Sequence, residues 1–134
     1  MKRYIVVRNE VEFVHRYLEA PSTVIHLRNY HRHIAHIETE IEVYHDDREL
    51  EFIIVKNSIN SAFNRNKIEM LYVDKSCEMV AQEVIEHVVR EFGNRAITCK
   101  VFEDGENGAK IVHNPRTRMV RDSLGHLIRE EITE

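Results

Sequence analysis

A run of strictly alternating residues, HRHIAHIETEIEVYH, constrains this chain more than any other feature. Every second position from His31 holds a histidine or, in most cases, an apolar residue. The intervening positions carry most of the charge. This period of two predicts a β-strand with one buried face. Because residues i and i+2 of a strand point the same way, His31 and His33 both project from that face. A buried polar side chain needs a partner. We therefore expect these two imidazoles to make hydrogen bonds or to bind a metal ion.

Length and charge limit the class of protein. The chain has 134 residues, which suits a single domain, and its net charge is −4, with 19 Lys and Arg against 23 Asp and Glu. Neither sign forms a long block, so we expect neither nucleic acid nor a membrane as a partner. Only three apolar residues separate Tyr4 from Arg8, too few for a signal peptide, and we therefore expect a cytoplasmic protein.

Histidine is unusually frequent, with nine in the chain, and it is the commonest metal ligand. In the N-terminal run YIVVRNEVEFVHRYL, Val11, Phe13 and His15 share one parity, opposite to that of the acidic residues. This segment is typical of a half-buried strand with His15 facing inward. The adjoining strand then brings His31 and His33 toward it, provided that the two strands pair in a suitable register.

Three inward imidazoles with a fourth position left open are the ligand pattern of catalytic zinc. The sequence thus predicts a Zn²⁺ site formed by His15, His31 and His33. The alternative is that each histidine is an ordinary core or surface residue whose hydrogen bonds are satisfied. We exclude His36 from the site, because its parity places it on the charged face of the strand.

The rest of the chain predicts an α+β fold in the order βββααββ, with four to five antiparallel strands and two helices packed on one face. We expect a third strand over residues 49–55, a weak helix near Ile59, a clear helix over 76–92, and strands over 95–103 and 109–113. A loop over 24–30 carries His26. Residues 1–113 form the expected domain, and the polar tail over 114–134 is a short helix or an oligomer contact.

Glu103 ends the strand over 95–103 and shares its parity with three apolar residues. One interpretation is a solvated carboxylate at the edge of the sheet. The other is a carboxylate that accepts two hydrogen bonds from the N–C–N edge of a heterocycle. The sequence leaves both open. Cys77 and Cys99 have no activating neighbour in the pattern, so we expect two reduced, unreactive thiols.

Several short motifs together resemble the 6-pyruvoyltetrahydropterin synthase and 6-carboxytetrahydropterin synthase family. That family has an F-x-x-x-H-type segment, then H-G-H, then V-D-F ahead of a helix, then T-x-E at a helix start, and a pterin-binding Glu at a strand end. The corresponding segments here are Phe13-Val14-His15-Arg16, Tyr30-His31-Arg32-His33, Glu51-Phe52 leading to Lys56, Ser76-Cys77-Glu78 and Val101-Phe102-Glu103. The resemblance covers residues 4 to 113 and depends on their joint spacing.

The resemblance implies the tunnelling fold, in which subunits join their sheets into a barrel with the active site at a subunit interface. It implies a homo-oligomer, commonly a hexamer. By this similarity His15, His31 and His33 would bind zinc and Glu103 would anchor the pterin ring. Family members act on 7,8-dihydroneopterin triphosphate, eliminating triphosphate and rearranging or cleaving the side chain.

The chain also departs from the family pattern where protons are handled. The family's catalytic Cys lies four residues before the first His of H-G-H, and that position is Leu27 here. The family's Asp-His pair has only Asp74-Lys75 as its nearest equivalent. His26 and Asp74 are therefore our candidates for the acid and base, and His87 is a further one.

Three hypotheses follow from these matches and departures. The first is a zinc-dependent lyase of the synthase type, acting on a pterin or a purine-type compound. The second is a catalytically divergent oligomer that binds a pterin or a nucleotide. The third is an oligomeric scaffold in which the histidines are structural.

Overall fold

The alternating run forms β2 (His31–Val43), which pairs antiparallel along its whole length with β1 (Arg3–His15). The computed structural model describes residues 1–64, 72–73, 75–115 and 117–131. Within them, β2 also pairs antiparallel with β4 (Ile97–Glu103), and β4 pairs antiparallel with β5 (Asn107–His113). A two-residue strand, β3 (Tyr72–Val73), adds to β1 in parallel, which gives the order β3-β1-β2-β4-β5. The predicted α+β class is confirmed.

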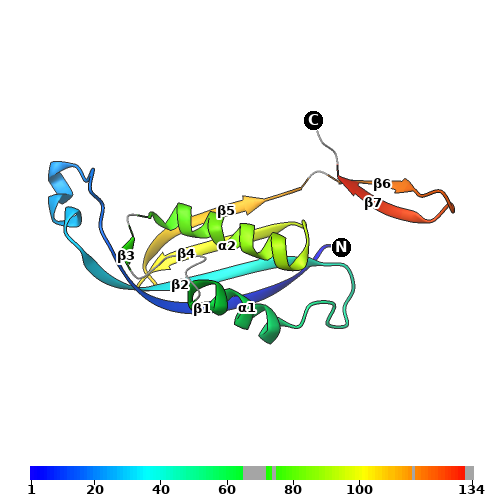
Figure 1. Cartoon of the computed structure of the whole chain (residues 1–134), viewed down its shortest axis with the longest axis horizontal. Helices are drawn as coiled ribbons and strands as arrows, with labels where there is room; N and C mark the ends of the chain where they lie inside the picture. The colour runs from blue at the N-terminus through cyan, green and yellow to red at the C-terminus, as the bar shows by residue number, and fades with distance from the viewer. Residues whose placement is uncertain (65–71, 74, 116, 132–134) are drawn as a thin grey trace.

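Two helices, α1 (Phe52–Asn64) and α2 (Cys77–Phe92), cover one face of this sheet (Figure 1). Apolar residues of both helices pack on the inward positions of the strands and form one core. The fully or nearly fully buried residues of the helices are Val55, Ile59, Ala62, Val80, Ala81, Val84 and Val88. Among the described residues, no helix combines the length and apolar character needed to cross a membrane.

Helix α2 begins and ends where the sequence predicts. Ser76 precedes it in an extended conformation, and its hydroxyl accepts a hydrogen bond from the backbone N–H of Met79 at 3.2 Å. Gly93 ends the helix with φ 98°, a conformation that a side chain disfavours. This capped helix places Cys77 and the backbone of Lys75 beside the ends of β1 and β4, where the candidate site lies.

The predicted strand over residues 49–55 is wrong, because helix α1 begins at Phe52 instead. The carboxylate of Glu51 accepts hydrogen bonds from the N–H groups of Ile53 and Ile54, at 2.8 and 3.0 Å, and so satisfies donors of the first turn. Phe52 and Ile54, whose parity suggested a buried strand face, are 57% and 62% exposed. Among the long elements of the main sheet and its helices, the order is ββααββ, not βββααββ.

The tail forms a hairpin rather than the short helix that was one of its two predicted alternatives. Strands β6 (Thr117–Arg121) and β7 (Leu127–Glu131) pair antiparallel, and the hairpin extends away from the main sheet in Figure 1. Asp122 accepts hydrogen bonds from the N–H groups of Leu124 and His126, and Gly125 lies in the turn with φ 82°. The other alternative, an oligomer contact, stays a prediction.

A largely covered ion pair joins the segment after β2 to the segment just before β4. Arg95 Nη1 lies 2.5 Å from Glu49 Oε2, and the same guanidinium donates to the carbonyls of Glu42 and Phe92. Burial by itself would raise the pKa of Glu49, but hydrogen bonds from Arg95 and from the backbone of Tyr44 outweigh it and hold this pKa below its usual range. The pair thus stabilises the folded state when Glu49 is ionised.

We expect Glu49→Gln to lower the free energy of unfolding at neutral pH by about 2 kcal/mol, because Arg95 is left buried with a weaker partner. The folded-state pKa of Glu49 is depressed, so its contribution is present above the unfolded-state value and is lost as the pH falls through the folded-state value. The difference between wild type and variant should therefore shrink in acid. Urea denaturation at neutral and acidic pH measures this, with the exposed Asp47→Asn as control. A difference that is the same at both pH values would contradict the role of this ion pair.

Candidate metal centre

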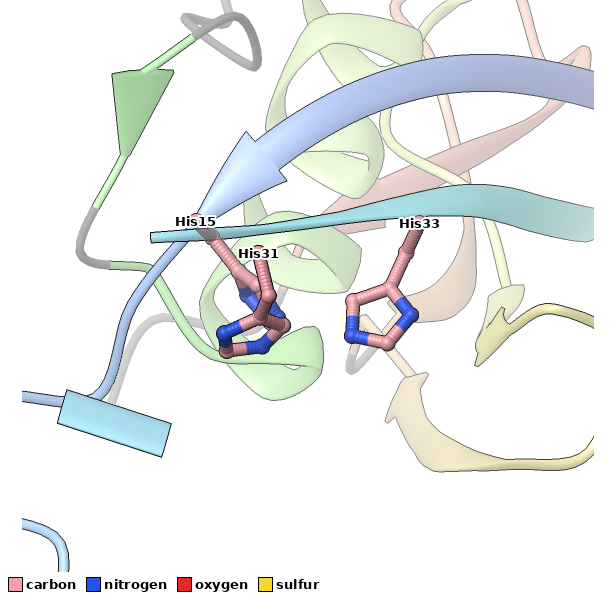
Figure 2. Close-up of side chains that lie close together, drawn as sticks. All are labelled: His15, His31 and His33. Atoms are coloured by element: carbon pink, nitrogen blue, oxygen red, sulfur yellow. The ribbon is translucent and has the colours of Figure 1, made fainter. Parts of the chain in front are cut away.

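Three histidines meet where β1 ends and β2 begins (Figure 2). His15 lies directly opposite His31 in the β1–β2 register, and His33 follows two residues along β2 on the same face. The ring centroids are 4.3 Å apart for His15 and His31, 5.0 Å for His15 and His33, and 4.8 Å for His31 and His33. The register that the sequence analysis required is the one that forms.

The ligand atoms of the three histidines all lie within 4.8 Å of one another. Nitrogen ligands at about 2.0–2.1 Å from a tetrahedral zinc are about 3.4 Å apart, so small rotations of the side chains bring the three atoms to that spacing. Each residue offers one imidazole nitrogen, a ligand of the type that zinc prefers. The three residues fit a metal ion, and the cluster can hold one.

Two of the rings are oriented through their Nδ1 atoms. His31 Nδ1 lies 2.9 Å from the carbonyl oxygen of Asn29, and His33 Nδ1 lies 2.5 Å from Oδ2 of Asp104. Both partners are acceptors, so Nδ1 carries the proton and Nε2 keeps its lone pair in the neutral ring. Metal-binding histidines are usually held in this way, with the second nitrogen bonded to a carbonyl or a carboxylate.

His15 contributes a buried nitrogen, Nε2, that makes no hydrogen bond within the described part of the chain but lies 3.3 Å from Oε1 of Glu103. Burial lowers the pKa of His15, assisted by the neighbouring histidines and opposed by Glu103 and by a hydrogen bond with the backbone of Lys75. The ring is therefore neutral at pH 7, which is the form that binds metals. A metal ion would satisfy a buried nitrogen that makes no hydrogen bond within the described residues.

Glu103 lies beside the histidines. It is opposite Ala35 in the β2–β4 register, so its side chain extends on the same face of the sheet. Its Oε1 lies 3.3 Å from Nε2 of His15, and its Oε2 lies 3.5 Å from Nε2 of His33. The carboxylate is about two-thirds covered, at 32% exposure. Glu103 thus belongs to the neighbourhood of the cluster, while the ligand that it binds stays a prediction.

Cys77 is next to Glu103 but is not a nucleophile. Its Sγ lies 3.8 Å from Oε1 of Glu103. Burial, together with the charges of Glu103 and Glu78, raises the pKa of the Cys77 thiol to about 12. Burial raises the pKa of Cys99 to about 12 as well. Both thiols stay protonated at neutral pH, which is consistent with the lack of an activating neighbour for either cysteine in the sequence pattern.

Neither candidate for the acid and base, His26 or Asp74, is seen in contact with the three histidines in the described part of the chain. His26 is exposed on the 3₁₀ helix η1 (Ser22–Arg28), which connects β1 and β2. Leu27 follows it, half-buried, and its carbonyl accepts a hydrogen bond from the N–H of Tyr17 at 2.7 Å. Asp74 lies outside the described residues. The catalytic roles of His26 and Asp74 therefore stay predictions.

Two further histidines have partners elsewhere. His36 is on the opposite face of β2, where its Nδ1 lies 3.4 Å from Oε1 of Glu10, so its exclusion from the cluster is confirmed. His87 is buried on α2, and its Nε2 lies 2.9 Å from Oγ of Ser58 on α1. This contact ties the two helices together.

The chain matches no protein-family model and no curated protein. The resemblance to the tetrahydropterin synthases is therefore an expectation that depends on the spacing of short motifs. The three-dimensional arrangement adds separate support for a metal or ligand site, because side chains from three strands, β1, β2 and β4, meet at one place. They are His15, His31, His33 and Glu103.

Proposed function

We propose that the chain is a zinc-dependent lyase of the 6-pyruvoyl- or 6-carboxytetrahydropterin synthase type. Its substrate in this proposal is 7,8-dihydroneopterin triphosphate or a related pterin or purine compound, and it acts as a homo-oligomer of the tunnelling fold, such as a hexamer. The observation that carries the proposal is the cluster of three imidazoles on one face of the sheet, His15, His31 and His33, with a carboxylate at its side. Three histidines leave a fourth position for a substrate oxygen.

His15, His31 and His33 would hold the zinc ion, which when bound would supply Lewis-acid polarisation of a substrate carbonyl or hydroxyl oxygen. The protein's own contribution begins with His15, which burial keeps neutral and therefore ready to bind. Glu103 contributes a carboxylate beside the three histidines, where it can bind the substrate. Its carboxylate faces Nε2 of His15 and of His33, and if these nitrogens held the metal they would carry no proton to donate to it. Its oxygens are then available to accept two N–H donors from a heterocycle.

Proton transfer needs a group other than residue 27, because the side chain of Leu27 can act neither as a nucleophile nor as a base. We propose His26 and Asp74 for this role. His26 is exposed and adjacent to Leu27 in η1, and an imidazole is suited to exchange protons near neutral pH. In this proposal His26 acts on a side-chain hydroxyl of the substrate, and Asp74 supplies the second proton-transfer group.

The test is triphosphate release from 7,8-dihydroneopterin triphosphate by the zinc-loaded protein. We expect release that depends on zinc and that exceeds the release by a His15→Ala variant under the same conditions. The His26→Gln variant should bind zinc normally and release triphosphate more slowly. No release above the His15→Ala control would count against the synthase activity.

A second candidate function is binding of a pterin or nucleotide without turnover. Leu27 at the position of the family's catalytic Cys, together with the protonated thiol of Cys77, favours this candidate. It predicts that a pterin binds the zinc-loaded chain, that Glu103→Gln weakens this binding, and that the ligand is recovered unchanged. Calorimetric titration followed by chromatography of the ligand distinguishes the binder from the lyase.

A further inference from the structure

We propose that Asp104 is a positioning residue of the metal centre, which holds His33 in the tautomer that offers Nε2 to the ion. This inference rests on the proposed zinc site, but it concerns the metal-free protein as well. Asp104 follows Glu103 in the turn between β4 and β5. The pattern of the sequence does not single it out, and the contacts of its carboxylate assign the role.

The carboxylate of Asp104 is fixed at both oxygens. Oδ2 lies 2.5 Å from Nδ1 of His33, and Oδ1 accepts a hydrogen bond from the backbone N–H of Ile34 at 2.8 Å. The backbone N–H of Asp104 in turn donates to the carbonyl of Ile34 at 2.8 Å. The side chain is 46% exposed, yet its two contacts with one segment of β2 determine its orientation, and the backbone contact holds the residue beside that segment.

An ionised carboxylate can only accept hydrogen bonds. Nδ1 of His33 must therefore donate to Asp104, and a neutral ring then has its lone pair at Nε2. The same carboxylate increases the basicity of the ring as a ligand, as in other carboxylate–histidine–metal arrangements. Asp104 thus acts on a bound metal through His33 and does not contact the metal itself.

The backbone explains how two consecutive acidic residues reach the same imidazole. In a regular strand, residues 103 and 104 would point to opposite faces. Asp104 instead has φ 56°, in the left-handed region, and the chain turns there. As a result Glu103 faces Nε2 of His33 at 3.5 Å, while Asp104 binds Nδ1.

The variant that tests the proposal is Asp104→Asn. Asparagine tolerates a positive φ, and its Oδ1 can still accept from Ile34, so the turn is retained. Its Nδ2 would then donate to Nδ1 of His33, which must become the acceptor and shift the ring proton to Nε2. We expect zinc affinity, measured by chelator competition, to fall by about 10- to 100-fold. In the metal-free protein at about pH 8, ¹⁵N NMR should show the His33 proton moving from Nδ1 to Nε2.

Glu106→Gln is the matched control, because it removes one negative charge from the same turn and the Glu106 side chain is exposed. It should leave both the zinc affinity and the tautomer unchanged. Asp104→Gly, which also accepts a positive φ, leaves Nδ1 to water and should weaken zinc binding less than Asp104→Asn does. Thermal unfolding of each variant checks that the fold is retained.

Two results would overturn the proposal: zinc affinity of Asp104→Asn equal to that of Glu106→Gln, or an unchanged His33 tautomer. If the wild type binds no zinc, the proposed function fails. The NMR measurement on the metal-free protein still decides whether Asp104 sets the tautomer. The failure of one claim can thus be told from the failure of the other.

Discussion

Replacing His31 and His33 together by alanine is expected to reduce bound zinc from about one equivalent per chain to less than about a tenth. Each histidine supplies one of three ligands, and His15 alone cannot hold a zinc ion against competing water. Because the metal binds the folded chain and stabilises it, the double variant should also lose any increase in unfolding temperature that zinc gives the wild type. Elemental analysis of the purified, zinc-reconstituted proteins, with melting curves in zinc and in chelator, measures both effects.

His36→Ala is the control for that experiment, because it removes a histidine from the same strand but from the opposite face. It should retain the zinc content of the wild type and the same thermal response to zinc. Equal zinc content in the wild type and in the double variant would show that any bound metal is elsewhere. The third hypothesis, in which the histidines are structural, would then be preferred.

Gly108→Ala is expected to destabilise the fold by about 3 kcal/mol or more. Gly108 lies opposite Phe102 in the β4–β5 ladder. An added Cβ would be 1.9 Å from the carbonyl oxygen of Val101 and 2.7 Å from the Cα of Phe102. These are backbone atoms of the paired strand, so the clash is relieved only if the two strands separate. Thermal and urea unfolding should show the loss, with a melting temperature lower by about 10 °C or more.

The same substitution should also disturb the metal centre, because Glu103 and Asp104 follow Phe102 directly. Gly105→Ala is the matched control in the same turn. Its Cβ would meet nothing closer than the ring of His36 at 3.7 Å, and only its φ of 73° would be strained, at about 1–2 kcal/mol. If Gly108→Ala lowered the free energy of unfolding by no more than Gly105→Ala does, the close approach of β5 to β4 would be contradicted.

Local signals account for the parts of the fold that the sequence predicts. The alternation of β2 is long enough to assign a strand, and its parity correctly places His33 inward and His36 outward. Helix α2 carries both a capping serine, Ser76, and a terminal glycine, Gly93, so its ends are encoded next to the helix itself. The cluster forms because the register of β1 and β2 places His15 opposite His31 and keeps His33 on the same face.

The strand over residues 49–55 and the helix in the tail were wrong predictions, and both depended on short patterns of apolar residues. Leu50, Phe52 and Ile54 alternate over only three positions, and such a stretch is ambiguous between strand and helix. Packing of Val55 and Ile59 against the sheet decides in favour of the helix, which the segment alone does not reveal. In the tail, where a short helix was one expectation, Gly125 with its positive φ lies in the turn of a hairpin.

The contact between Asp104 and His33 could not be predicted from strand alternation. Strand parity places Asp104 on the face away from the histidines, and only its positive φ brings its carboxylate to His33. An acidic residue just before Gly105 indicates a turn, but it does not indicate which side chain the turn will approach. Contacts of this kind depend on the path of the backbone after a strand has ended.

Zinc-edge X-ray absorption spectroscopy of the reconstituted wild-type protein tests the central claim most directly. We expect one zinc per chain with three imidazole nitrogens at about 2.0–2.1 Å, and a spectrum that loses imidazole scattering in the His15→Ala variant. A protein that binds no zinc, or a zinc with fewer than three imidazole ligands, would contradict the assignment of His15, His31 and His33 as a metal centre.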